Sequence, residues 1–475
     1  MRTLTTILLL AIGLLNSTKA WPHEGYAECH EAIINLELDK ADKMIAQYPD
    51  GYHKSWLSAY ALFVKQLSTL EKPQSDAFAD ILKNLRQYDN DSPDYLQCLS
   101  DIYLMKCYAH FVNSSYIAAY AAYIKARQTI GGIGSNYWHR QRFRLIELIM
   151  ENQMQNVAPL FADNLTSAER VKQYCAVVKE LTSRTDVPEQ FKHEIEIASL
   201  LLFPLVSDDN NAALRLMQSF GYQWRTSSPI AAYTAAERLI AADSTAQALK
   251  ILTSACESGF AKRLNLLNLR LGNAMLNVGN DSCEFYLRQF IANQPNPSDV
   301  LYAKFKLAWY LFLKGNDTGS EAMCQKVMQS AAVTALDVQA KYECAMNRYW
   351  DTLLLRARLA FDAADYQRCK SILEVAGQQK SRFTPIQTNE YNYRMGRVCH
   401  KTGDFVNAKR FYEAAIDRHL EKTLYYPCYS AYYIGLIYKQ EYDKAKADEY
   451  FKLCRKIDSP IYGESIHQKA SRAME

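Results

Sequence analysis

The feature that most constrains this chain is a pattern of small and large residues that recurs at equal spacing near its C-terminal end. In the stretch 393–416 (YRMGRVCHKTGDFVNAKRFYEAAI), small residues stand at Gly396, Ala408 and Ala415, and Tyr412 follows Ala408 by one helical turn. A Gly-Asp pair separates two amphipathic segments. Small residues at such positions let two antiparallel helices approach closely, and the aromatic ring fills the remaining gap. The stretch therefore predicts a helical hairpin.

The same pattern repeats. Shifting it by 39 residues in either direction again finds small residues where two helices would meet and a large residue one turn later. The matching positions are Gly435, Ala447 and Phe451 on one side, and Ala357, Cys369 and Leu373 on the other. Looser matches continue upstream. Only 17 glycines and 13 prolines occur in 475 residues, which also favours helices. The chain is therefore predicted to be all-α and built of stacked hairpins.

This pattern resembles the tetratricopeptide repeat (TPR), a helix–turn–helix unit defined by such small and aromatic positions. The resemblance is good over 351–460 and fair over 229–329, and the early part of the chain looks like exported bacterial TPR-like proteins. It implies a right-handed α-solenoid. We expect an N-terminal TPR-like helical region over 21–195, a TPR array over 196–460, and a C-terminal capping helix over 461–475.

The first twenty residues have the features of a secretory signal peptide. Arg2 is followed by an apolar run at 7–15 and by small residues ending at Ala20. Nine apolar residues are too few to span a bilayer, which needs about 20, so cleavage near Ala20 is expected. No later run is long enough to span a membrane either. The mature chain is predicted to be exported, periplasmic or associated with the cell envelope, without a transmembrane segment.

Composition excludes some classes of function. A hydrophobic content of 49% is too high for a wholly disordered chain. A net charge of +4, spread along the sequence, is too small and too dispersed to indicate a nucleic-acid partner.

The adjacent Cys399 and His400 raise the question of a metal site or a catalytic pair. On a helix, neighbouring residues point about 100° apart, and the repeat pattern places Cys399 at the helix contact, so packing is the preferred interpretation. The twelve cysteines are irregularly spaced, and no CxxC occurs. Mainly free, buried thiols are expected, with Cys369 and Cys399, or Cys428 and Cys454, as the pairs to test. Known catalytic and metal-binding motifs are absent, which predicts no cofactor and no metal site.

In a TPR array, the first helices of successive repeats line the concave side. The resemblance therefore implies a set of groove residues that would contact a partner. The predicted partner-binding residues are Tyr302, Phe305, Trp309, Phe312, Arg358, Tyr393, Arg397, His400, Tyr432 and Lys439. Aromatic rings beside guanidinium groups suit a peptide with apolar anchors and an acidic or C-terminal carboxylate end.

The favoured hypothesis is a non-enzymatic, exported TPR scaffold that binds a peptide or protein partner in its concave groove. Two alternatives stay open. A glycan-binding TPR protein of an outer-membrane nutrient-uptake system would use an aromatic platform such as Trp309. A helical-barrel enzyme would need two carboxylates facing each other across a cavity.

Overall fold

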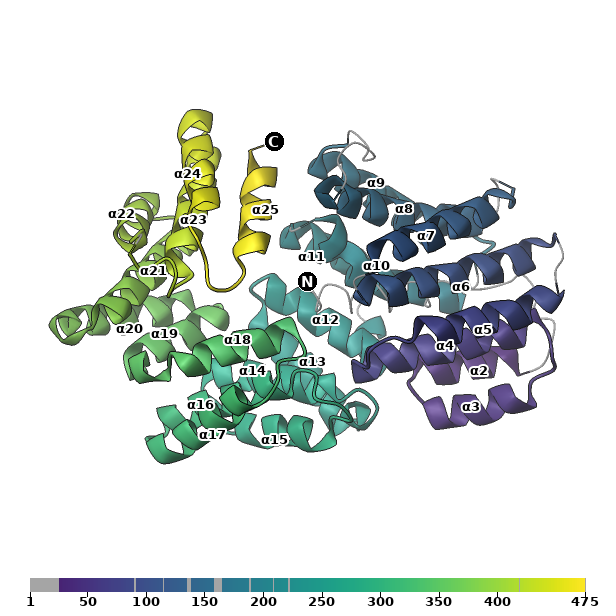
Figure 1. The fold of residues 1–475 in the computed structure, drawn as a ribbon, viewed down its shortest axis with the longest axis horizontal. Helices are drawn as coiled ribbons and strands as arrows, with labels where there is room; N and C mark the ends of the chain where they lie inside the picture. The colour runs from purple at the N-terminus through teal and green to yellow at the C-terminus, as the bar shows by residue number, and fades with distance from the viewer. Residues whose placement is uncertain are drawn as a thin grey trace. The chain divides into compact units, whose positions relative to one another are not determined.

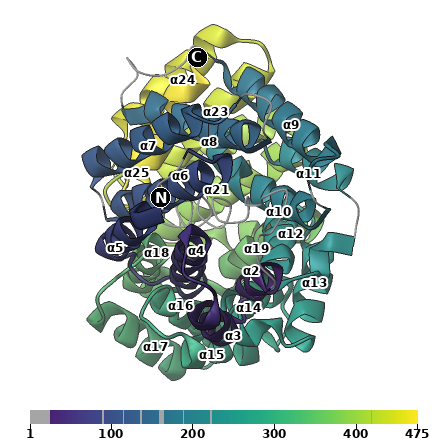
Figure 2. The same cartoon turned by 90° about the vertical axis from the view of Figure 1, so that its right-hand side faces the viewer.

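The computed structural model contains only helices, turns and loops among the residues it describes (Figures 1 and 2). The described ranges are 25–88, 91–113, 115–134, 138–157, 165–187, 189–207, 209–220, 223–417 and 419–474. Since no strand occurs within these ranges, the all-α prediction is confirmed. The predicted signal peptide, 1–20, lies outside them. None of the described helices has both the length and the apolar character needed to cross a membrane.

The chain divides into two compact units. Unit 1 comprises the described residues up to Leu271 together with Ala292–Ser298, and unit 2 comprises Gly272–Ile291 and Asp299–Glu475. The boundary expected between 195 and 196 falls inside helix α10 (Glu189–Val206), whereas the structural division lies within α14 (Leu266–Val278).

Unit 1 is held together by a fully buried ion pair as well as by apolar packing. Its other helices are α2 (Tyr26–Ile34), α3 (Leu38–Gln47), α4 (Tyr52–Thr69), α5 (Ser75–Leu85), α6 (Pro93–Val112), α7 (Tyr116–Gly131), α8 (Trp138–Val157), α9 (Ser167–Ser183), α11 (Asn210–Ser219), α12 (Pro229–Ala241) and α13 (Thr245–Glu257). Arg142 pairs with Asp101, and the Trp56 indole donates to the same carboxylate at 3.3 Å. The pair links α4, α6 and α8.

Unit 2 consists mainly of helices that pair as hairpins. Its helices after α14 are α15 (Cys283–Asn293), α16 (Val300–Leu313), α17 (Asp317–Gln329), α18 (Ala335–Ala345), α19 (Thr352–Asp362), α20 (Tyr366–Gln378), α21 (Pro385–Lys401), α22 (Phe405–Ala415), α23 (Tyr426–Gln440), α24 (Lys444–Lys456) and α25 (Gly463–Ala473). The hairpins are α16–α17, α19–α20, α21–α22 and α23–α24 (Figure 1).

The small residues of the repeat stand where the helices touch, as the sequence predicted. A Cβ placed on Gly396 would come within 2.5 Å of the Tyr412 ring, and one on Gly435 within 2.5 Å of the Phe451 ring. Ala408 is fully buried at the same contact. The pattern thus reports close approach of α21 to α22 and of α23 to α24.

Each of the last three hairpins turns in the same way. The second residue before the second helix is left-handed, with φ of 62° at Ala364, 81° at Gly403 and 61° at Tyr442. An aspartate follows and caps the next helix by accepting a hydrogen bond from a backbone N–H; these residues are Asp365, Asp404 and Asp443. The aspartates recur every 39 residues, so the turn belongs to the repeat.

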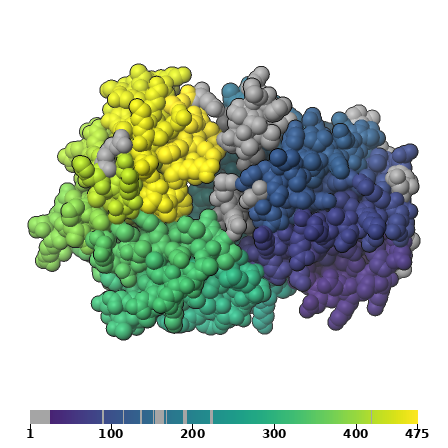
Figure 3. Space-filling view, viewed as in Figure 1, coloured from purple at the N-terminus to yellow at the C-terminus, as the bar shows by residue number. Residues whose placement is uncertain are grey.

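The last helix, α25, closes the apolar end of the α23–α24 hairpin. Ile466 and Ala470 are fully buried against residues such as Phe451 and Cys454. In the space-filling view, the C-terminal helices form one continuous surface (Figure 3).

Candidate functional site

Two cavities in unit 2 share Arg358 as part of their walls. One has a volume of about 30 Å³ and the other about 230 Å³. The smaller has room for a water molecule or two, while the larger can accept a side chain or a small polar group.

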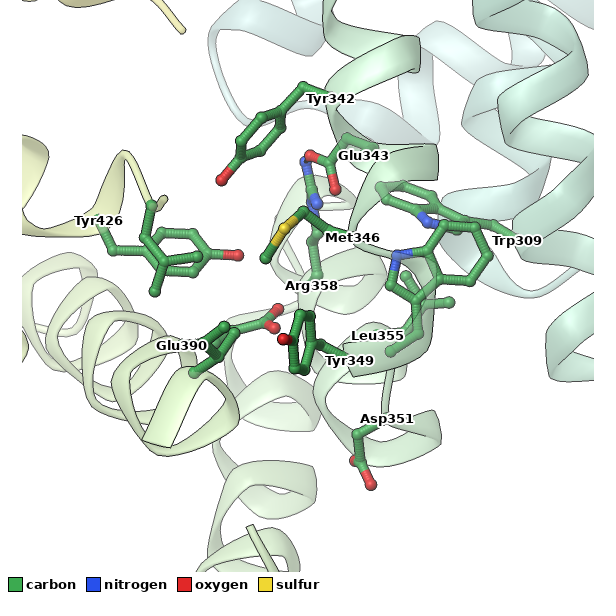
Figure 4. Close-up of a pocket in the computed structure, with 13 residues that line it drawn as sticks. Trp309, Tyr342, Glu343, Met346, Tyr349, Asp351, Leu355, Arg358, Glu390 and Tyr426 are labelled. Atoms are coloured by element: carbon green, nitrogen blue, oxygen red, sulfur yellow. Dashed lines mark hydrogen bonds and ion pairs between the residues drawn. The ribbon is translucent and has the colours of Figure 1, made fainter. Parts of the chain in front are cut away.

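Side chains from α16, α18, α19, α21 and α23 and from the connecting segments enclose the smaller cavity, and most of them are aromatic or acidic. Figure 4 shows Tyr342, Met346, Glu390 and Tyr426 turned toward a common space beside Arg358. The indole N–H groups of Trp309 and Trp350 also line it, and neither has a hydrogen-bond partner among the described residues. Buried donors of this kind are normally satisfied by ordered water, which the volume allows.

Guanidinium groups dominate the larger cavity. Its lining residues are Gln339 of α18; Ala357, Arg358, Phe361 and Asp362 of α19; Tyr393, Arg394 and Arg397 of α21; and Tyr425. Arg394 and Arg397 share one face of α21 because they are three residues apart.

Two of these arginines already have carboxylate partners. The Arg358 guanidinium donates to Glu343 Oε1 at 2.8 Å, and Arg394 Nε donates to Glu390 Oε1 at 2.7 Å. All four side chains are largely buried. Because each charge is balanced by its partner, these pairs stabilise the wall without leaving a free acid.

Arg397 is held differently. Its guanidinium donates to the Tyr393 hydroxyl at 3.0 Å and lies 4.5 Å from the ring centroid of Phe361 and 4.6 Å from that of Tyr433. Within the described part of the chain, no carboxylate lies within ion-pair distance of it. Cation–π contacts of a desolvated guanidinium are worth about 2 kcal/mol or more. Arg397 is therefore a positive group held in place by aromatic rings, with capacity to bind an anion.

A second cation lies over the aromatic part of the site. Lys306 Nζ is 4.0 Å from the Trp309 ring centroid, and Arg358 Cζ is 4.5 Å from the centroid of the same side chain. Burial, reinforced by the nearby Arg358 charge, lowers the pKa of Lys306 to about 7, although Asp362 and Glu343 oppose this change.

The structure brings together three of the residues predicted from the sequence. Arg358, Tyr393 and Arg397 line the larger cavity. Phe305 and Trp309 are essentially inaccessible, with exposed fractions of 0% and 1%. They therefore form the packed floor under Lys306 and present no open groove face.

The remaining predicted residues lie outside the larger cavity. Tyr302 and Phe312 are partly buried next to the aromatic floor. Tyr432 packs against Phe451 at the α24 contact, and Lys439 is exposed and donates to the Ala473 carbonyl at 2.6 Å. His400 is partly buried, with Nδ1 3.4 Å from the Tyr412 hydroxyl.

Sequence reasoning missed Arg394, Asp362, Gln339, Tyr425 and Lys306. Arg394 could have been found from its spacing to Arg397 on one helix face. The others reach the site only because several helices and a connecting segment converge there, and their local sequence carries no signal for it.

The Cys399–His400 pair does not form a shared site. The Cys399 side chain is buried at the helix contact, with 2% exposure, and burial raises the pKa of its thiol. Burial, together with Arg397 and Lys401, lowers the pKa of His400 to about 4. Across the described ranges, no group of three or more His, Cys, Asp or Glu side chains is arranged to hold a metal ion.

Comparisons with known proteins do not identify a family for this chain. No protein-family model matches the chain, and neither does any curated protein. Among solved structures, the apo form of RapI is similar over 82% of this chain and 95% of that chain, at 12% sequence identity and a TM-score of 0.29. A TM-score this low supports no statement about this chain.

Proposed function

We propose that this protein is a non-enzymatic, exported helical-repeat scaffold of the TPR-like type, which binds a peptide or protein partner through the α19 and α21 helices of unit 2. The observation that carries the proposal is Arg397. It is a guanidinium among aromatic rings, in the wall of a 230 Å³ cavity, without a carboxylate partner among the described residues.

Binding of an acidic group by Arg397 follows from elementary energetics. A partly desolvated cation without a counter-charge is costly, and the rings offset only part of that cost. An anionic group delivered by a partner would form charge-assisted, bidentate hydrogen bonds with the guanidinium. Arginine and tyrosine are also the residues that most often contribute strongly to protein interfaces. The cavity thus offers an anchor point for one acidic group of the partner.

The same geometry disfavours the enzyme alternative. The smaller cavity contains Glu343, Glu390 and Asp351. Glu343 and Glu390 each form an ion pair with an arginine, and Asp351 accepts hydrogen bonds from the backbone N–H groups of Leu353 and Leu354 in the first turn of α19. A space of about 30 Å³ between them is too small for a sugar ring.

The glycan alternative loses its expected platform. Trp309 has an exposed fraction of 1% and lies under the Lys306 ammonium group, so its face is not available for stacking on a sugar.

The export part of the proposal rests on the N-terminal sequence.

The test compares two charge reversals in the full-length protein. Wild type, Arg397→Glu and Lys439→Glu are used to capture partners from the native compartment, and the captured proteins are identified by mass spectrometry. Lys439 is the matched control because it is an exposed cation away from the cavity. We expect a partner that is retained by wild type and Lys439→Glu but lost by folded Arg397→Glu. Equal capture by all three proteins would refute the proposal.

A further inference from the structure

We propose that the segment anchored in this cavity carries an anion and a cation on neighbouring residues, with the anion bound at Arg397 and the cation at Asp362. This inference rests on the proposed function and specifies the chemistry of the partner at the same site.

Asp362 is the observation behind it. It is the last residue of α19, its side chain is exposed, and it lines the same cavity as Arg397. Within the described ranges its side chain forms no hydrogen bond or ion pair, and its carboxylate is farther from Arg397 than an ion pair allows. The two residues are nevertheless close neighbours, because the Phe361 ring next to Asp362 lies under the Arg397 guanidinium.

The charged side chains that line the larger cavity explain why a partner segment with one positive and one negative charge is favoured. Arg358 is balanced by Glu343, and Arg394 by Glu390. Among the lining side chains, one positive group at Arg397 and one negative group at Asp362 remain; Lys306, which lies outside the lining, is near enough to Asp362 for their charges to interact. A lone anion is attracted by Arg397 and repelled by Asp362. A segment carrying both charges interacts favourably with both residues.

Burial sets the orientation of the bound segment. The Arg397 guanidinium packs against the rings of Phe361 and Tyr433 and is partly buried, whereas Asp362 is exposed. The acidic side chain therefore enters the cavity, and the basic side chain stays at its mouth, where its charge remains hydrated. A volume of about 230 Å³ accepts one side chain, so only the acidic side chain can enter. The basic side chain must reach Asp362 from outside the cavity, and a residue adjacent in the peptide can do this.

Three acetylated and amidated peptides of identical length, each with one tyrosine, serve as probes. The first contains adjacent Glu and Lys, the second replaces the Lys by Leu, and the third replaces the Glu by Gln. Their affinities for the full chain are measured by calorimetry for wild type, Asp362→Asn and Arg397→Gln. Asp362→Asn changes an exposed side chain that forms no hydrogen bond or ion pair within the described ranges, so folding should be preserved.

We expect the Glu–Lys peptide to bind wild type about two- to fivefold more tightly than the Glu–Leu peptide, as for an exposed ion pair. That preference should disappear in Asp362→Asn. The Glu–Lys and Glu–Leu peptides should both bind Arg397→Gln about tenfold to a hundredfold more weakly than they bind wild type. The Gln–Lys peptide, which lacks the acidic group, should bind wild type as weakly as the Glu–Lys peptide binds Arg397→Gln.

The outcomes separate the two proposals. Equal binding of the first two peptides, with loss in Arg397→Gln, would overturn the paired-charge inference and leave the proposed function intact. A preference for Lys that survives in Asp362→Asn would overturn the inference as well. Binding that does not depend on Arg397 would overturn both, and no binding of any probe would overturn the inference alone.

Discussion

Adding a single methyl group at Gly396 should open the α21–α22 hairpin. The new Cβ would lie 2.5, 2.7 and 2.9 Å from three ring atoms of Tyr412, well inside normal van der Waals contact. The ring cannot swing away easily, because it is fully buried and stacks on Tyr433 at 5.6 Å between centroids. One of the two helices must therefore shift.

The expected size of this effect is the difference between two terms. Overpacking a buried contact costs about 1–3 kcal/mol, and the distances at Gly396 point to the upper end of that range. Replacing glycine by alanine inside a helix stabilises the helix by about 1 kcal/mol, because alanine has the higher helix propensity. Gly396→Ala should therefore destabilise the hairpin by about 1–2 kcal/mol. Gly131→Ala at the end of α7 is the control, because its Cβ would meet nothing closer than 3.7 Å and no loss is expected.

Hydrogen exchange is the appropriate assay, because a chain with two compact units does not have a single well-defined free energy of unfolding. In Gly396→Ala, amide exchange in α21 and α22 should become about 5- to 30-fold faster. Gly435→Ala should do the same in α23 and α24, since its Cβ would lie 2.5 Å from Phe451. Unchanged or slower exchange in α21 and α22 would show that the small residues do not mark a tight helix contact.

Three further predictions concern the same array. The Cys428 and Cys454 sulfurs are 3.6 Å apart and fully buried, and their hydrogen bond together with burial raises the pKa of the Cys454 thiol, so oxidised glutathione should leave this pair reduced in the folded protein; a Cys428–Cys454 disulfide found by mass spectrometry would refute this. Because the pKa of His400 is lowered to about 4 in the folded state, stability should fall as pH drops from about 6.5 toward 4, and His400→Gln should flatten that dependence in thermal melts. Tyr442 is 95% exposed and left-handed, where the preceding repeat has Gly403, so Tyr442→Gly should stabilise α23–α24 by about 1 kcal/mol; faster exchange there would contradict this.

The helical hairpins could be predicted from the sequence because they depend on local, periodic packing. The spacing of Gly396, Ala408 and Tyr412 states which faces of two helices meet, and the structure places them in contact. The capping aspartate of the turn also recurs in the sequence. The left-handed position before it is harder to predict, because it is a glycine only at Gly403, whereas Ala364 and Tyr442 occupy it in the other two hairpins.

The site was predictable only in part. Arg358 and Arg397 follow from the repeat, since each occupies an equivalent position on the first helix of its hairpin. Trp309 occupies such a position too, but it is buried because Arg358 and the segment containing Trp350 pack against it. That burial depends on tertiary packing, which the spacing of one helix does not contain.

The most direct measurement of the central claim is the side-chain Nε–Hε resonance of Arg397 in arginine-labelled protein, assigned by its absence in Arg397→Gln. On titration with a captured partner, or with the Glu–Lys peptide, this resonance should shift and saturate at the same midpoint as binding itself. A resonance that stays in place while binding saturates would show that the acidic group is held elsewhere.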